Sequence, residues 1–207
     1  MKLRRLAAAV VLLAAAALSE ETQLSKLPDF SATEVRGGGS HQLVWKIYHS
    51  GNMLRLDMSP AAAAIFDPGA DKVYHLLILP DKTTCIEMPS SRSQVKRSPL
   101  QTVFSGKMEI TPAGTETIDG HSYTVEKIVT TTPKGETINS KIWRADEFKG
   151  APARVELYVG KQTFTTIYRD IKSGTPDPTL FKPEMKCIPE DKAYQIATPP
   201  PLPSPPK

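Results

Sequence analysis

The chain has 207 residues, of which 40% are hydrophobic and 23% are charged. This length suits one domain that buries an ordinary core without a structural metal. The 26 Lys and Arg exceed the 22 Asp and Glu, but three of these cations, Lys2, Arg4 and Arg5, lie at the very start of the chain. The remainder is nearly neutral and has no basic stripe interleaved with aromatic residues, so the composition argues against a nucleic-acid partner.

Residues 1–19 have the pattern of a cleavable secretory signal peptide. The basic head is followed by thirteen apolar residues, Leu6 to Leu18, and then by small residues that suit a cleavage site. A helix that crosses a bilayer needs about 20 apolar residues, so this run is too short for a span. No cysteine near the cut offers a site for a lipid anchor. We expect a periplasmic or secreted protein, and the alternative is an uncleaved membrane anchor.

Beyond this leader, apolar and polar residues alternate in several runs between Phe30 and Ile171. This period of two predicts strands with one buried face. Turns rich in Gly, Pro and Asp separate the runs at short intervals, so nine to eleven strands should follow one another in meander order. The pattern predicts a mainly β domain over residues 20–190, built on a single antiparallel sheet.

Three other segments lack this alternation. Residues 90–104 are polar with scattered apolar positions and predict a short helix broken by Pro99, whereas residues 145–150 predict one helical turn closed by Gly150. Residues 191–207 end in a proline-rich run that cannot join a sheet, so we expect a disordered tail there. The tail is a ligand for a groove-type domain, a spacer or simply a free end.

The sequence shows no motif for catalysis or metal binding. None of the four histidines, His41, His49, His75 and His121, has another metal-ligating residue at a recognised spacing. There is also no nucleophile elbow and no glycine-rich loop that leads into a helix. We therefore expect a protein that is not an enzyme and holds no cofactor or metal. The alternative is an active site built from two carboxylates that meet only in space.

A long sheet with one apolar side must cover that side. With few helical residues available, the sheet either closes on itself or keeps a concave apolar surface under a partial lid. A concave apolar surface suits acyl chains, because each buried methylene contributes about 0.8 kcal/mol. The alternative is an ordinary core that is completely filled.

The order of several short motifs resembles that of the LolA-like superfamily, which contains periplasmic lipoprotein-sorting carriers and related exported domains. Each motif alone is weak, and the resemblance rests on their order and spacing from about Phe30 to Pro189. The matching segments are Gly51–Asp57, Ile65–Gly69 with Lys72–Tyr74, Trp143–Asp146, Ala151–Glu156, and Asp177–Phe181 with Pro183.

The resemblance implies an unclosed half β-barrel, in which a curved antiparallel sheet carries short helices as a lid. Its concave face would receive the acyl chain of a lipid or lipoprotein, without cofactor or catalysis. We expect a monomer with envelope proteins as further partners. The proline-rich tail and the short, polar loop helices depart from the carriers, so the alternative function is a cell-envelope interaction domain with a filled core.

The alternation assigns ten apolar side chains to the concave face. A register error of one residue would turn a whole strand's set to the other face. The assigned residues are Trp45, Ile47, Leu54, Leu56, Met58, Ile86, Met88, Val155, Leu157 and Val159.

Arg55 lies between two of these residues on its strand. Its side chain should therefore lie on the convex side, with the guanidinium paired to a carboxylate or a backbone carbonyl. The alternative is an Arg55 that faces the ligand and takes part in lipid transfer.

The two cysteines, Cys85 and Cys187, either form one disulfide or remain two small apolar residues. Cys85 alternates with Ile86 and Met88 and should point away from the hollow. We predict one structural disulfide that fastens the C-terminal segment across the outside of the sheet, so that reduction loosens residues after about 180 before the domain melts.

Overall fold

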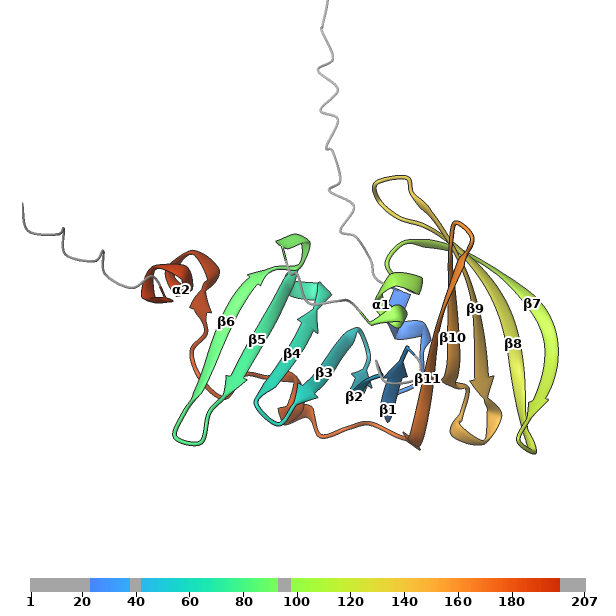
Figure 1. Cartoon of the computed structure of the whole chain (residues 1–207), viewed down its shortest axis with the longest axis horizontal. Helices are drawn as coiled ribbons and strands as arrows, with labels where there is room; N and C mark the ends of the chain where they lie inside the picture. Colours follow the sequence, from blue (N-terminus) through green and yellow to red (C-terminus); the bar gives the residue numbers. More distant parts are fainter. Residues whose placement is uncertain (1–22, 38–41, 93–97, 198–207) are drawn as a thin grey trace, which may run out of the picture.

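The computed structural model describes residues 23–37, 42–92 and 98–197 (Figure 1). The predicted signal peptide, residues 1–19, and the proline-rich end of the chain from residue 198 lie outside these ranges. Residues 191–197, which we expected to belong to a disordered tail, instead lie in a helix, α2 (Glu190–Ala197). This run contains no Pro or Gly and begins with two acidic residues, which stabilise a helix N-terminus.

The described residues form twelve strands and a few short helices. The strands are β1 (Phe30–Arg36), β2 (Leu43–Ser50), β3 (Met53–Ser59), β4 (Ala62–Asp67), β5 (Lys72–Ile78), β6 (Thr83–Pro89), β7 (Lys107–Ile118), β8 (His121–Thr131), β9 (Thr137–Ala145), β10 (Ala151–Val159), β11 (Gln162–Ser173) and β12 (Ile188–Pro189). Besides α2, the helices are η1 (Gln23–Lys26), η2 (Pro68–Ala70), η3 (Ser90–Arg92), α1 (Pro99–Val103), η4 (Asp146–Phe148) and η5 (Pro178–Phe181).

All twelve strands belong to one sheet that does not close. Strands β1 to β6 form one antiparallel meander, β7 to β11 form a second, and β1 pairs with β11 to join them. The strand order β12-β6-β5-β4-β3-β2-β1-β11-β10-β9-β8-β7 leaves β7 and β12 as the two edges. The predicted mainly β, unclosed half-barrel is confirmed. It differs from a purely antiparallel sheet only where β12 runs parallel to β6.

Two short helices lie inside the curve of this sheet. Figure 1 shows α1 and η1 between the two meanders, and we call the side of the sheet that faces them the concave face. We expected Pro99 to break a helix in residues 90–104, but Pro99 is the first residue of α1. Proline is tolerated there because the N–H that it lacks would have no partner within the helix.

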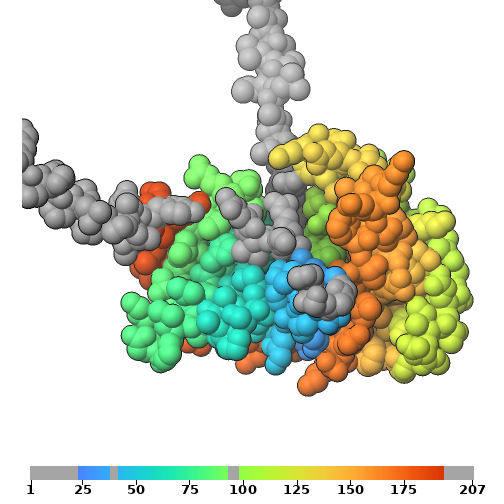
Figure 2. Space-filling view, viewed as in Figure 1, coloured from blue at the N-terminus to red at the C-terminus, as the bar shows by residue number. Residues whose placement is uncertain are grey.

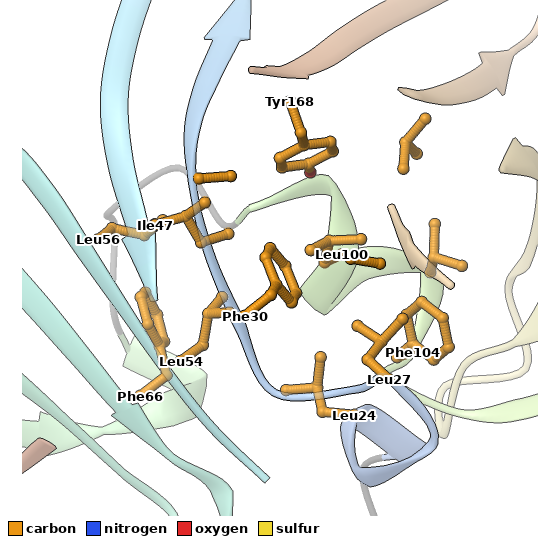
Figure 3. Close-up of a cluster of buried hydrophobic side chains, with 14 of the residues drawn as sticks. Leu24, Leu27, Phe30, Ile47, Leu54, Leu56, Phe66, Leu100, Phe104 and Tyr168 are labelled. Atoms are coloured by element: carbon orange, nitrogen blue, oxygen red, sulfur yellow. The ribbon is translucent and has the colours of Figure 1, made fainter. Parts of the chain in front are cut away.

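The larger buried cluster lies on the concave face. Side chains from η1, from strands of both meanders and from α1 point toward one another in Figure 3. The core therefore sits in the hollow of the sheet rather than between two layers of sheet.

Gly106 brings the chain from α1 into β7. A side chain at this position would clash, because a Cβ would lie 2.2 Å from the carbonyl oxygen of Thr131.

The convex face is covered differently behind β3 to β6. A second buried cluster contains Ala63, Ile65, Leu76 and Cys85, which alternate along their strands with residues of the concave face. Residues 174–189, which we call the C-terminal strap, leave β11 and reach the far edge of the sheet at β12. Within the described ranges, no helix is long and apolar enough to cross a bilayer.

Candidate functional site

The strand register brings the predicted concave residues onto one face. Leu54 lies opposite His49 and Phe66, while Leu56 lies opposite Ile47 and Ala64, and directly opposed side chains share a face. Four of the ten predicted residues, Ile47, Leu54, Leu56 and Val155, are completely buried in the larger cluster. Four more pack against that cluster while partly exposed: Trp45, Met58, Met88 and Leu157.

The other two predicted residues lie further from the core. Ile86 is partly buried and stands opposite His75, two positions from Met88 on the same face. Val159 is 58% exposed at the end of β10. The register places Val159 on the predicted face, but β11 pairs with β1 only from Thr166 on, so the hairpin that carries Val159 extends past its neighbour. The concave face therefore changes from buried to exposed along its strands.

One end of the concave face is filled by the chain itself. Leu100, Val103 and Phe104 from α1 and its C-terminus are completely buried, together with Phe30 at the start of β1 (Figure 3). A hydrogen bond also supports this packing, because the Thr130 hydroxyl of β8 donates to the Val103 carbonyl oxygen of α1 at 2.6 Å. We call this region the filled end. These side chains occupy that part of the hollow.

A buried carboxylate holds α1 against the sheet. The side chain of Glu34 is completely buried, and it accepts hydrogen bonds from the Ser98 hydroxyl at 2.7 Å and from Arg36 Nε at 2.6 Å. Ser98 is the N-cap of α1, and its own N–H donates to Gln101 Oε1 at 2.9 Å. The contact between Glu34 and Ser98 therefore joins β1 to the beginning of the helix.

Tyr168 and Trp45 complete this polar cluster. Burial and the nearby Glu34 carboxylate raise the pKa of Tyr168 well above its ordinary value of 10.0, so its hydroxyl stays neutral. The Arg36 guanidinium lies 4.5 Å from the centroid of the Trp45 ring, a cation–π contact. Because Arg36 already pairs with Glu34, its charge is largely neutralised within the protein.

The other end of the concave face keeps large apolar side chains exposed. Leu43 is 40% exposed, Leu77 47% and Phe164 52%, although register places all three on the same face as the core. Together with the exposed Val159 and three partly buried neighbours they form the concave rim. We define it as Leu43, Trp45, Met58, Leu77, Leu157, Val159 and Phe164.

Arg55 lies on the convex face, away from the rim. Its Nε is 2.6 Å from Asp57 Oδ1, and its Nη1 donates to the Leu180 carbonyl oxygen in η5 at 2.9 Å. A carboxylate and a backbone carbonyl are the two kinds of partner that we expected for Arg55 on the convex face. The contact to Leu180 fastens the C-terminal strap to β3, so the geometry gives Arg55 no access to a ligand in the hollow.

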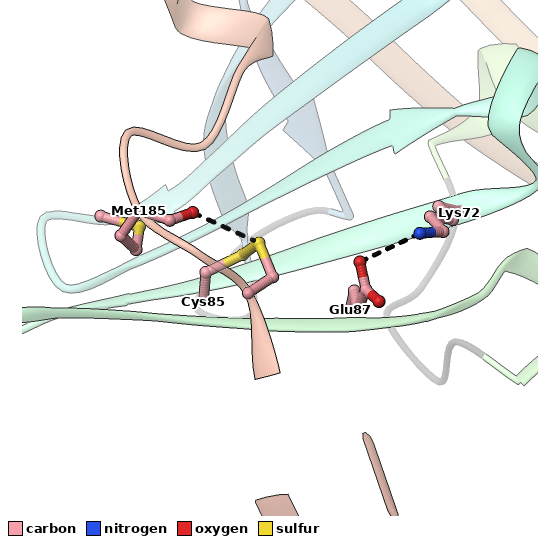
Figure 4. Close-up of a disulfide and its surroundings, with 5 residues drawn as sticks. Lys72, Cys85, Glu87 and Met185 are labelled. Carbon is pink, nitrogen blue, oxygen red and sulfur yellow. Dashed lines mark hydrogen bonds and ion pairs between the residues drawn. A yellow bond between two sulfur atoms is a disulfide. The ribbon is translucent and has the colours of Figure 1, made fainter. Parts of the chain in front are cut away.

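The structure joins Cys85 and Cys187 by a disulfide. The bridge lies in the convex cluster beside Met185, and an ion pair between Lys72 and Glu87 lies close by (Figure 4). It closes a loop with a sequence separation of 102 residues just before the strap reaches β12. The bridge does not line the hollow.

Several residues of this site were missing from the sequence assignment. Alternation does place Glu34 on the face of Phe30 and Ala32, which was a signal for a buried acid. The packing of Leu100 and Phe104 into the hollow had no such signal, because five helical residues show no useful periodicity. Among the described residues, no three His, Cys, Asp or Glu side chains are grouped so as to hold a metal ion.

The unclosed, curved sheet with short helices in its hollow is the arrangement that the resemblance to the LolA-like superfamily implied. Solved structures to which it is similar include MucB, with 13% identity, a TM-score of 0.43 and coverage of 80% of this chain. Only 61% of MucB is covered, so the chain spans less than two thirds of that protein. A scan against family models and a search of curated proteins give no significant match.

Two further solved structures are similar to this chain. The Mycobacterium tuberculosis lipoprotein LppX is 14% identical with a TM-score of 0.39, and the match covers 74% of this chain and 91% of LppX. A LolA superfamily protein from Nitrosomonas europaea is 10% identical with a TM-score of 0.32, and the match covers 80% of this chain and 94% of that protein. At these identities the likeness concerns the fold alone.

Proposed function

We propose that this chain is an exported binding protein that holds the acyl chain of a lipid or lipoprotein against its concave rim. One observation carries the proposal: three large apolar side chains on the inward face of a curved sheet, Leu43, Leu77 and Phe164, remain 40–52% exposed. Large apolar side chains that stay exposed on the inner face of a curved sheet are candidates for a binding site.

The chemistry of the rim suits an acyl chain rather than a polar ligand. Its side chains are aliphatic or aromatic, and Arg36, which lies over the Trp45 ring of the rim, is paired with Glu34. Each methylene that leaves water contributes about 0.8 kcal/mol, so a chain of several carbons gains affinity without any hydrogen bond. The polar end of the lipid would stay in water beyond the rim.

The filled end limits how much of the ligand enters. Helix α1 has only five residues, and the contact of Ser98 with Glu34 is its polar attachment to β1. A short acyl segment fits the proposal with α1 in place, whereas a longer one requires α1 to leave its place against β8 and β10. The energetic cost of that displacement would favour short or partial insertion.

The second candidate is an envelope interaction domain that carries no lipid. The filled end favours it, because Leu100 and Phe104 already occupy one end of the hollow. The two functions differ in whether the exposed rim contacts a lipid or another protein.

Native mass spectrometry of the protein purified after export tests the proposal. We expect an adduct with the mass of a lipid, and we expect the double variant L43T/L77T to retain less of it. Threonine keeps the strand preference and removes apolar surface. The matched control is Val44→Thr, since Val44 is 53% exposed next to Leu43 on the convex face. An unmodified mass for the native protein, or equal loss in the control, would contradict the proposal.

A further inference from the structure

The hairpin between β10 and β11 projects from the body of the molecule. Residues 162–165 pair with β10, but the pairing of β11 with β1 begins only at Thr166. Figure 1 shows the hairpin as a projecting loop, and Figure 2 shows it as an orange protrusion beside the loop between β8 and β9. We call residues 157–164 the hairpin tip.

The hairpin tip exposes large apolar side chains on both of its faces. Val159 is 58% exposed and Phe164 52% exposed on the concave side, and Tyr158 is 38% exposed on the convex side. The Tyr158 hydroxyl donates to Glu156 Oε2 at 2.7 Å, which directs its polar atom back toward the sheet. A two-sided apolar tip does not serve the hollow alone, because only one of its faces borders the hollow.

The charge of the hairpin tip is positive. The sequence from Leu157 to Phe164 contains Lys161 at the turn and no acidic residue. The nearest acid, Glu156, is already paired with Arg154 and bonded to Tyr158. Apolar and aromatic side chains around a lysine match the interface of a bilayer, where rings lie at headgroup depth and lysine meets phosphate.

We propose that the hairpin tip docks on a lipid bilayer with anionic headgroups, placing Val159 and Phe164 in the interface and Lys161 beside the phosphates. The inference rests on the proposed function in one respect: Leu157 and Phe164 also belong to the concave rim, so docking would give an acyl chain a continuous apolar path from bilayer to hollow. The tip itself is too small to span the bilayer and would lie at its surface.

Vesicle flotation of the purified protein measures docking directly. We expect binding to vesicles that contain phosphatidylglycerol, with the partition coefficient lowered about tenfold or more in V159T/F164T, because binding scales with buried apolar area. The matched control is Ile167→Thr, which lies on the same strand inside the sheet and is 38% exposed. All variants carry the same chain ends, so any contribution of the ends cancels.

The lysine gives a second, separate readout. Lys161→Gln should lower binding about fivefold on vesicles with phosphatidylglycerol and leave binding to phosphatidylcholine vesicles unchanged, since one lysine near an anionic surface contributes about 1 kcal/mol. Equal flotation of V159T/F164T and native protein, or an equal loss in I167T, would overturn the docking and assign the tip to a protein partner.

The two proposals can fail separately. If the native mass carries no lipid but flotation depends on Val159 and Phe164, the binding function fails and docking stands. If the native protein carries lipid but does not float with vesicles, docking fails and lipid binding stands.

Discussion

The two ends of the concave face hold similar side chains but are covered differently. At the filled end, Phe104 from the end of α1 is completely buried, whereas at the rim Phe164 is 52% exposed on the same side of the sheet. The difference arises because α1 and η1 cover one end only. The comparison teaches that short helices cover one part of the hollow and leave large apolar side chains exposed in the other part.

The largest expected difference is in stability. Phe104→Ala should lower the free energy of unfolding by about 3–5 kcal/mol, because it opens a cavity in a packed cluster. Phe164→Ala should lower it by less than about 1 kcal/mol, because the ring is half in water already. Denaturant unfolding of both variants checks this pair. Equal losses would show that the two ends do not differ as described.

The disulfide should stabilise the convex strap without acting on the filled end. Replacing Cys85 and Cys187 by serine should lower the free energy of unfolding by about 2–4 kcal/mol, since a long loop is no longer closed in the unfolded chain. Hydrogen exchange should then rise in residues 174–189 while α1 keeps its protection. Loss of protection in α1 as well would mean that the strap supports the hollow.

The attachment of α1 gives a smaller effect. Ser98→Ala leaves a buried oxygen of Glu34 without its donor and should lower the free energy of unfolding by about 1–2 kcal/mol. It should also raise hydrogen exchange in α1. Ser105→Ala is the matched control, because the Ser105 hydroxyl donates only to the nearby Thr102 carbonyl oxygen. A control variant as unstable as Ser98→Ala would argue against the attachment.

The smallest expected effect is the pH dependence of folding stability that His49 causes at the filled end. Burial lowers the pKa of His49 below its ordinary value of 6.5, so the unfolded chain binds more protons than the folded one just below that pH. This contribution to stability is present above about pH 6.5 and is lost as the pH falls toward the lowered pKa. Unfolding measured across this range should show a flatter profile for His49→Gln; an unchanged slope would exclude His49 as a cause.

Alternation predicted the two faces of β3 well because charged residues separate its apolar positions. In β3, Leu54 and Leu56 are buried while Arg55 and Asp57 lie on the convex face, as the period of two requires. The turn at Gly51 was also predictable, since glycine there adopts a φ of 58°.

Three other features of the fold could not be predicted from the sequence, because they depend on contacts between distant parts of the chain. The filling of the hollow by α1 rests on packing against several strands, which a five-residue helix does not encode locally. The same holds for β12, whose two residues form a strand only because β6 offers a free edge beside them. The extension of the β10–β11 hairpin past β1 depends on where β1 ends.

Tryptophan quenching tests the binding function most directly. The chain has two tryptophans: Trp45 belongs to the concave rim, and Trp143 is only 3% exposed beneath Lys141 and Arg154 on the convex face. In the Trp143→Phe variant, a fatty acid with a spin label on its acyl chain should quench the fluorescence of Trp45 in a saturable way. In the Trp45→Phe variant the same ligand should leave Trp143 unquenched. Quenching of Trp143 alone, or of neither residue, would contradict acyl-chain binding at the rim.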